Sequence, residues 1–190
     1  MKRQVLFVQG GGAGAHDEWD DKLVESLKRA LGSDYEIRYP NMPNEAEPRY
    51  AAWKATLEDE LAALDDRAML VGHSIGGTML INVLAGQPTG RSFGGVFLVA
   101  SPFVGHGGWS DDDLKSPRDL GARLPPAVPV HVFHGLEDAT APPSHAELYA
   151  RAIPQAHVHR LPGRDHQLND DLSDVAAEIK LRDCGTSGER

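Results

Sequence analysis

The sequence predicts a three-layer α/β/α sandwich around a mainly parallel, six-stranded sheet, and two observations indicate this fold. Short apolar runs that suit buried strands alternate along the chain with segments of helical periodicity. The chain has 190 residues, of which 41% are hydrophobic and 25% charged, as expected for a soluble globular protein. Alternating strands and helices imply right-handed crossovers, with helices covering both faces of the sheet.

The elements of the first half follow from apolar runs and the residues that end them. Val5–Val8 is a continuous apolar run before three glycines, as in a strand buried on both faces. Residues 17–31 predict a helix, because apolar side chains recur at every fourth position. That apolar face consists of Trp19, Leu23, Leu27 and Leu31. Residues 35–39 form the second expected strand, which Pro40 ends, and residues 50–64 predict a helix rich in Ala, Leu and Glu.

The second half continues the alternation around one long connection. The expected strands are residues 68–71, 95–100, 128–133 and 156–161. The expected helices are residues 78–85, 143–153 and 172–181. We therefore expect one domain over residues 1–182, followed by a flexible tail at 183–190. Residues 101–126 interrupt the alternation of strands and helices, and we interpret them as a reduced cap or flap over the site.

Charge and composition limit the partners and the compartment. The chain has 19 basic and 28 acidic side chains, a formal charge of −9, which disfavours binding to nucleic acid or to membranes. The single cysteine, Cys184, excludes an internal disulfide. No apolar run approaches the roughly 20 residues that span a bilayer, and the N-terminus lacks a signal-peptide pattern. We expect a cytoplasmic protein whose partner is a small molecule; the sequence leaves its oligomeric state open.

The strongest motif is Gly72-His73-Ser74-Ile75-Gly76, which matches G-x-S-x-G between an expected strand and an expected helix. This context favours a sharp turn that exposes the Ser74 hydroxyl at the C-terminal edge of the sheet, while the glycines allow close packing. The turn also directs a helix N-terminus at developing negative charge. The alternative is an ordinary strand–helix turn that contains a serine.

A serine hydroxyl needs a base to remove its proton and an acid to orient that base. In chains with this motif the acid and then the histidine follow the serine. Asp138 follows the fifth expected strand and is the preferred acid, with its neighbour Glu137 as the alternative. His166 lies in a loop just past the sixth strand, at the same sheet edge as Ser74, and is the preferred base. The other histidines after Asp138 lie within elements: His145 in a helix, His157 and His159 in a strand.

Two backbone amides are needed to hold the oxyanion. One is expected from Ile75, the residue after the serine, and the other from the glycine run after the first strand, with Gly11 preferred and Gly12 next. The run lacks a G-K-[ST] ending, so nucleotide binding is disfavoured. The histidines lack metal-site spacing, so we expect no metal and no cofactor.

Together these motifs resemble the α/β hydrolases, and more narrowly the small serine hydrolases that include the retinoblastoma-binding-protein group. The resemblance runs from Val5 to about Leu181 and implies a compact α/β-hydrolase fold with little or no cap. It also implies a Ser74–His166–Asp138 triad that hydrolyses an ester or similar acyl bond through an acyl-enzyme. The sequence departs from the pattern at Gln9, where hydrolases often have histidine.

The substrate is less well determined than the reaction. A small carboxylic ester is our first expectation, and a thioester, lactone or peptide would use the same residues. A different class of function is a non-catalytic interaction module on a hydrolase scaffold. Candidate substrate contacts are Gly12, His73, Phe103 and Trp109. The two aromatic residues either form an apolar wall or pack the insertion onto the core.

Overall fold

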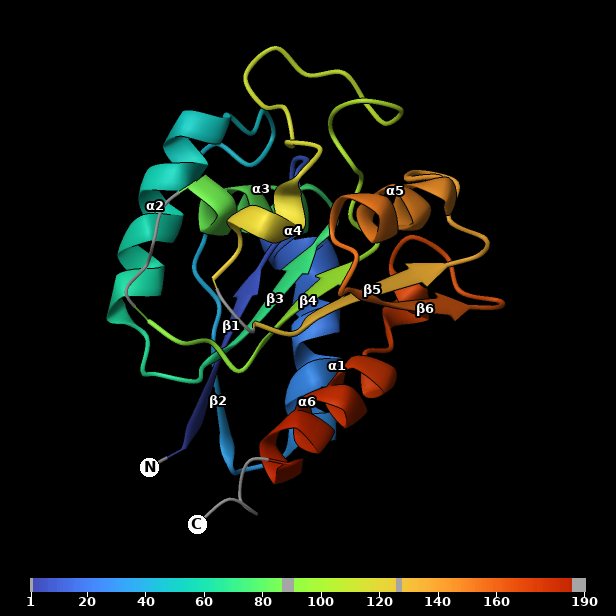
Figure 1. Cartoon of the computed structure of the whole chain (residues 1–190). Coiled ribbons are helices and arrows are strands. Elements are labelled where there is room, and N and C mark those ends of the chain that lie inside the picture. The colour runs from blue at the N-terminus through green and yellow to red at the C-terminus, as the bar shows by residue number, and fades with distance from the viewer. Residues whose placement is uncertain (1, 87–90, 126–127, 186–190) are drawn as a thin grey trace.

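The computed structural model describes residues 2–86, 91–125 and 128–185. Its centre is a six-stranded sheet with the order β2-β1-β3-β4-β5-β6, in which every neighbouring pair is parallel (Figure 1). The strands are β1 (Arg3–Val8), β2 (Tyr35–Arg38), β3 (Met69–His73), β4 (Gly95–Val99), β5 (Val130–Gly135) and β6 (His157–Leu161). The predicted parallel, six-stranded sheet is confirmed. The strand order reverses between β1 and β3, which is where open sheets of this kind bind ligands.

Helices cover both faces of the sheet and give two separate apolar clusters (Figure 1). One face packs against α1 (Asp21–Leu31) and α6 (Ser173–Gly185). The other face packs against α2 (Tyr50–Ala63), α3 (Ser74–Gly86), α4 (Leu120–Arg123) and α5 (Ser144–Ala152). The expected three-layer arrangement therefore holds, with strands buried on both sides.

The segment before α1 differs from the expected helix. Residues Ala15–Asp20 form η1, a π-helical stretch, and the α-helix starts only at Asp21. A π-helix bonds each residue to the fifth one along, so the four-residue spacing of the apolar face does not extend into it. Trp19, expected on the buried face, is 55% exposed, whereas Asp20 is 1% exposed. The Asp20 side chain therefore points into the protein, which the sequence did not predict.

The insertion at 101–126 is fastened to the core rather than detached from it. Its chain bends back on itself, with the Trp109 amide donating to the Phe103 carbonyl at 2.9 Å and the Ser116 amide to the Val104 carbonyl at 2.8 Å. Its buried side chains include Phe103, Val104, Leu114, Leu120 and Leu124. Leu120 begins the short helix α4, which the sequence did not indicate. Residue 126 lies outside the described residues.

The two ends of the described chain meet at the N-terminal edge of the sheet. Arg3 at the start of β1 forms an ion pair with Asp183 near the end of α6, at 3.2 Å. Helix α6 continues to Gly185, so residues 183–185 of the expected tail are helical, and residues 186–190 lie outside the described part. Among the described residues, no helix has the length and apolar character needed to cross a membrane.

Candidate active site

Ser74 stands at the first position of α3, directly after β3 ends at His73. Its φ of 50° is unusual for a residue with a side chain, and it marks a strained turn. The glycine two residues on is needed for close approach, because a Cβ on Gly76 would lie 2.0 Å from the Gln9 carbonyl oxygen. The turn therefore presses against the end of β1 while holding the Ser74 hydroxyl outward.

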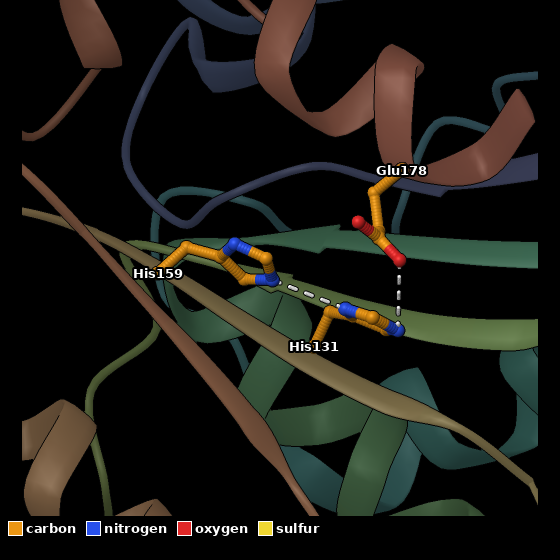
Figure 2. A group of neighbouring side chains, drawn as sticks. All are labelled: His131, His159 and Glu178. Carbon is orange, nitrogen blue, oxygen red and sulfur yellow. Dashed lines mark hydrogen bonds and ion pairs between the residues drawn. The ribbon is translucent and has the colours of Figure 1, made fainter. Parts of the chain in front are cut away.

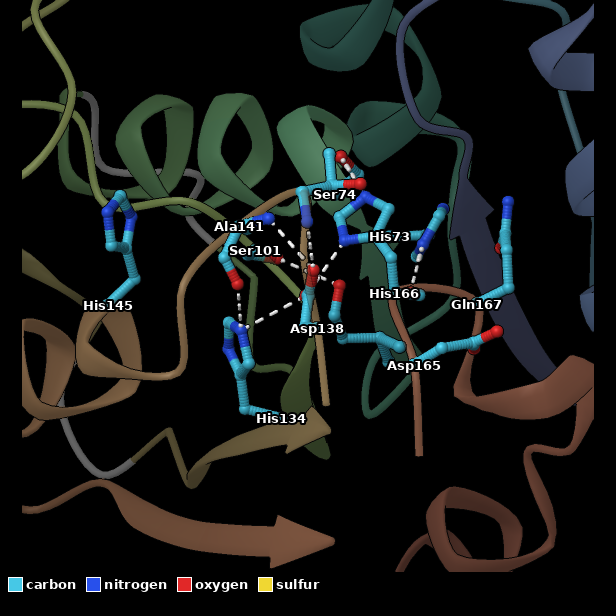
Figure 3. Close-up of polar contacts among 12 residues, drawn as sticks. His73, Ser74, Ser101, His134, Asp138, Ala141, His145, Asp165, His166 and Gln167 are labelled. Carbon is cyan, nitrogen blue, oxygen red and sulfur yellow. Dashed lines mark hydrogen bonds and ion pairs between the residues drawn. The ribbon is translucent and has the colours of Figure 1, made fainter. Parts of the chain in front are cut away.

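Ser74, His166 and Asp138 form one hydrogen-bonded chain of side chains (Figure 3). Nε2 of His166 lies 3.0 Å from Oγ of Ser74, and Nδ1 of His166 lies 2.8 Å from Oδ2 of Asp138. The three residues come from the ends of β3 and β5 and from the loop after β6. This geometry lets the imidazole accept the hydroxyl proton while the carboxylate fixes its tautomer.

The carboxylate of Asp138 is fully enclosed and has several donors. Its Oδ1 accepts from the amides of Thr140 and Ala141, each at 2.8 Å. Its Oδ2 faces both His166 and Nε2 of His134, the latter at 3.2 Å. Burial alone would raise the pKa of Asp138, but the hydrogen bonds from His134 and His166 outweigh it and hold that pKa well below its ordinary value. Asp138 is therefore a carboxylate at neutral pH.

A second buried pair, His73 with Asp20, lies beside this chain of side chains. Nδ1 of His73 is 2.9 Å from Oδ2 of Asp20, and Nε2 is 3.1 Å from the carbonyl oxygen of His166. Both ring nitrogens thus face acceptors, which is the arrangement that a doubly protonated imidazolium satisfies. Burial opposes the charge, but Asp20 raises the pKa of His73, and His73 lowers the pKa of Asp20. The pair ties the turn at Ser74 to the backbone of the histidine loop.

The loop after β1 supplies the other side of the site. The amide of Gly11 donates to no group in the part of the chain that the structure describes, whereas the amide of Gly12 donates to the Glu45 carbonyl at 2.7 Å. A Cβ on Gly11 would lie 2.9 Å from Cγ2 of Ile75 and 2.8 Å from Cγ of Pro48. Gly11 and Ile75 are therefore neighbours, as the two expected oxyanion donors must be. Gly12 is not free to serve as one.

Gln9 and Glu45 fix the course of this glycine loop. The Gln9 side chain is completely buried, and its oxygen accepts from the Met42 amide at 3.0 Å while its nitrogen donates to Glu45. The Glu45 carboxylate also accepts from the amides of Gly14 and His16, each at 2.8 Å. An amide side chain can accept and donate at once, which explains how glutamine serves at a position that often holds histidine.

The candidate substrate contacts predicted from the sequence differ in their burial and in the residues they touch. His73 is 2% exposed with both nitrogens occupied, so the structure places it behind the site rather than against a substrate. Phe103 is 4% exposed and packs edge-on against Tyr149, which makes it a core residue of the insertion. Trp109 is 38% exposed and rests edge-on against His145. His145 in turn accepts from the Phe103 amide at 2.8 Å, so it anchors the insertion.

Two cavities border the insertion. One, of about 430 Å³, is lined by Pro48, which touches the Gly11 side of the site, and by Tyr50, Met79 and residues 110–113. The other, of about 540 Å³, is lined by Trp109 and other residues of the insertion. The residues that line both cavities are Ser110, Asp111 and Asp112.

Asp20 and His134 belong to the site, although the sequence did not indicate a role for either. Asp20 gave no signal, because regular α-helical spacing points Trp19 inward and leaves the next residue on another face. His134 stands four residues before Asp138 at the end of β5, and it had no assigned role. Its Nε2 lies 2.8 Å from the Ala141 carbonyl as well as near Asp138, so it braces the loop that holds the carboxylate.

The fold and the site define an α/β hydrolase with a serine at its strand–helix turn. The chain belongs to the serine hydrolase family, whose pattern matches residues 5–171. YdeN of Bacillus subtilis (strain 168), a protein named as a presumed hydrolase, is 30% identical over 100 residues. That match covers 53% of this chain and 51% of YdeN, so it spans about half the length of the curated relative.

Solved structures support the fold over nearly the whole chain. The structure of the B. subtilis ydeN gene product superposes with a TM-score of 0.75 at 22% identity, covering 96% of this chain and all (100%) of that one. The CarC enzyme, a serine hydrolase involved in carbazole degradation, gives a TM-score of 0.69 at 17% identity, covering 95% and 90%. At these identities the likeness shows the fold alone. The narrower resemblance to the retinoblastoma-binding-protein group stays a prediction.

Proposed function

We propose that this chain hydrolyses a small carboxylic ester or related acyl bond, with Ser74 as nucleophile, His166 as general base and Asp138 as the acid of a catalytic triad. One observation carries the proposal: His166 bridges the Ser74 hydroxyl at 3.0 Å and the Asp138 carboxylate at 2.8 Å. Membership of the serine hydrolase family supports the reaction class.

The reaction runs in two halves. Ser74 Oγ attacks the acyl carbonyl carbon while His166 Nε2 takes its proton, and the amides of Gly11 and Ile75 stabilise the oxyanion. The imidazolium then protonates the leaving alcohol as the carbonyl reforms, which leaves an acyl-serine. Water enters, gives a proton to His166 and releases the carboxylic acid, and that proton returns to Ser74.

Labelling with a fluorophosphonate probe tests whether Ser74 is activated. We expect the folded wild-type protein to be labelled, and Ser74→Ala and His166→Ala to lose labelling, because the probe needs a nucleophilic serine and its base. Ser110→Ala, an exposed serine of the insertion, is the matched control and should be labelled like wild type. Absence of labelling in folded wild-type protein would instead favour a non-catalytic interaction module. A panel of esters, thioesters, lactones and peptides then sorts the substrate classes.

Trp109 is expected to influence acyl-chain preference. It is 38% exposed and lines one cavity of the insertion, so Trp109→Ala should change the ratio of kcat/KM for long and short acyl esters by about 10-fold, as loss of an apolar contact does. The ratio is measured with aryl esters of increasing chain length. Trp19→Ala removes the other exposed tryptophan, which is outside that cavity, and should leave the ratio unchanged. An unaltered ratio in Trp109→Ala removes Trp109 from the substrate site.

A further inference from the structure

A group of histidines lies on the α6 face of the sheet, at the opposite end of β5 from the loop that holds Asp138. His131 is the second residue of β5, and His159 is in the neighbouring strand β6. Nδ1 of His131 lies 3.1 Å from Nε2 of His159. Glu178 extends from α6, and its Oε1 lies 3.7 Å from Nε2 of His131 (Figure 2).

One ring nitrogen of His131 has no hydrogen-bond partner in this arrangement. Its side chain is 2% exposed, and its Nε2 has no hydrogen-bond partner among the described residues. The distance of 3.7 Å to Glu178 is too long for a hydrogen bond. A buried polar atom without a partner is rare, and an absent ion is one of its ordinary explanations. Here the unpartnered nitrogen points at a carboxylate.

We propose that His131, His159 and Glu178 bind a divalent transition-metal ion such as Zn²⁺. One donor atom from each residue lies within 4.8 Å of the other two. Two imidazoles and a carboxylate are a normal Zn²⁺ donor set, with ligand distances of about 2.0–2.2 Å, so modest side-chain rotation would close them around an ion. The ion would join β5, β6 and α6, three elements that are distant in the sequence.

The surroundings suit metal binding. Nδ1 of His131 and Nε2 of His159 lie 3.1 Å apart, so one of these two nitrogens accepts a hydrogen bond and has a lone pair that a metal ion could take instead. Arg182 donates to Glu178 at 3.0 Å, and ligating carboxylates are commonly held by such a second partner. Spacing along the chain gave no hint of this site, because each ligand comes from a different element.

Metal titration of the intact chain tests this site without relying on activity. Protein freed of metal with a chelator is titrated with Zn²⁺ against a chromophoric competitor, and its Tm is followed in parallel. We expect one equivalent to bind and the Tm to rise. Glu178→Gln and His159→Gln each remove a proposed ligand, so each should weaken binding by more than the roughly 100-fold that loss of an outer-shell partner can cost, and should abolish the rise in Tm. Both positions are partly exposed, and the Tm in chelator shows that each variant is folded.

Two control variants test whether Zn²⁺ binds at these three residues rather than at other histidines. His157→Gln changes an exposed neighbour whose ring stacks on His131 at 5.1 Å, and it should bind Zn²⁺ like wild type. His166→Ala removes the proposed catalytic base and should also bind like wild type, which keeps this test independent of the proposed function. The inference is overturned if folded wild-type protein takes up no equivalent of Zn²⁺. It is equally overturned if Glu178→Gln and His159→Gln bind unchanged, or if His166→Ala loses binding.

Discussion

Asp138→Asn is expected to lower kcat for ester hydrolysis about 10⁴-fold, as loss of the acid does in other triads. The reason lies in the contacts of the carboxylate. Oδ1 accepts from the amides of Thr140 and Ala141, so the asparagine oxygen should keep that position. The asparagine NH₂ would then face Nδ1 of His166 and force the proton onto Nε2, which could no longer accept from Ser74. Steady-state kinetics with a short aryl ester measure the loss.

Glu137→Gln is the matched control for this prediction. Glu137 is next to Asp138 but exposed, and its change should alter kcat by less than about twofold, because surface substitutions have small effects. A large loss in Glu137→Gln together with normal turnover in Asp138→Asn would transfer the acid's role to Glu137. Thermal unfolding of both variants shows whether either loss reflects folding.

Asp20→Ala is expected to lower the free energy of unfolding by about 3–5 kcal/mol, the usual cost of breaking a buried ion pair. The substitution leaves the His73 imidazolium without its counter-ion, and it also removes the acceptor for the Gly10 amide at 2.7 Å. Urea unfolding measures the loss. Glu18→Ala, an exposed carboxylate of the same π-helical stretch, should stay within about 0.5 kcal/mol of wild type.

The pKa shifts of His73 and Asp20 determine how the stability difference between wild type and Asp20→Ala changes with pH. The folded-state pKa of His73 is raised above its ordinary value of 6.5, so its stabilising contribution is complete below that pH and is lost as pH rises toward the raised pKa. The folded-state pKa of Asp20 is lowered from 3.8, so its contribution is complete above that pH and is lost as pH falls. The difference between wild type and Asp20→Ala should therefore be largest between these two values. A difference that grows steadily above pH 6.5 would contradict a charged His73.

The sequence predicted the sheet and the candidate triad because both depend on local patterns. Each strand is a short apolar run, and Ser74, Asp138 and His166 each follow one, so parallel strands place all three at the same edge. The glycines around Ser74 predicted the tight turn, and the φ of 50° at Ser74 is its structural form. The bounds of the elements moved by only a few residues, as for β3, expected at 68–71 and found at Met69–His73.

What the sequence did not indicate depends on contacts between distant segments. The π-helical turn that buries Asp20 breaks the periodicity on which helix prediction relies. The partners of that carboxylate, Gly10 and His73, stand 10 and 53 residues away. Phe103 could be a substrate wall or a core residue on composition alone, and only its packing on Tyr149 places it in the core. The grouping of His131 with Glu178 is hidden for the same reason.

The ion pair between Arg3 and Asp183 brings the two ends of the described chain together at the edge of the sheet where the strands begin. Ser74, Asp138 and His166 follow strand ends, so they lie at the other edge. The contact between β1 and α6 and the candidate catalytic residues therefore lie at opposite edges of the sheet. A substitution that breaks the Arg3–Asp183 ion pair thus acts at a distance from the proposed nucleophile, with the length of the strands between them.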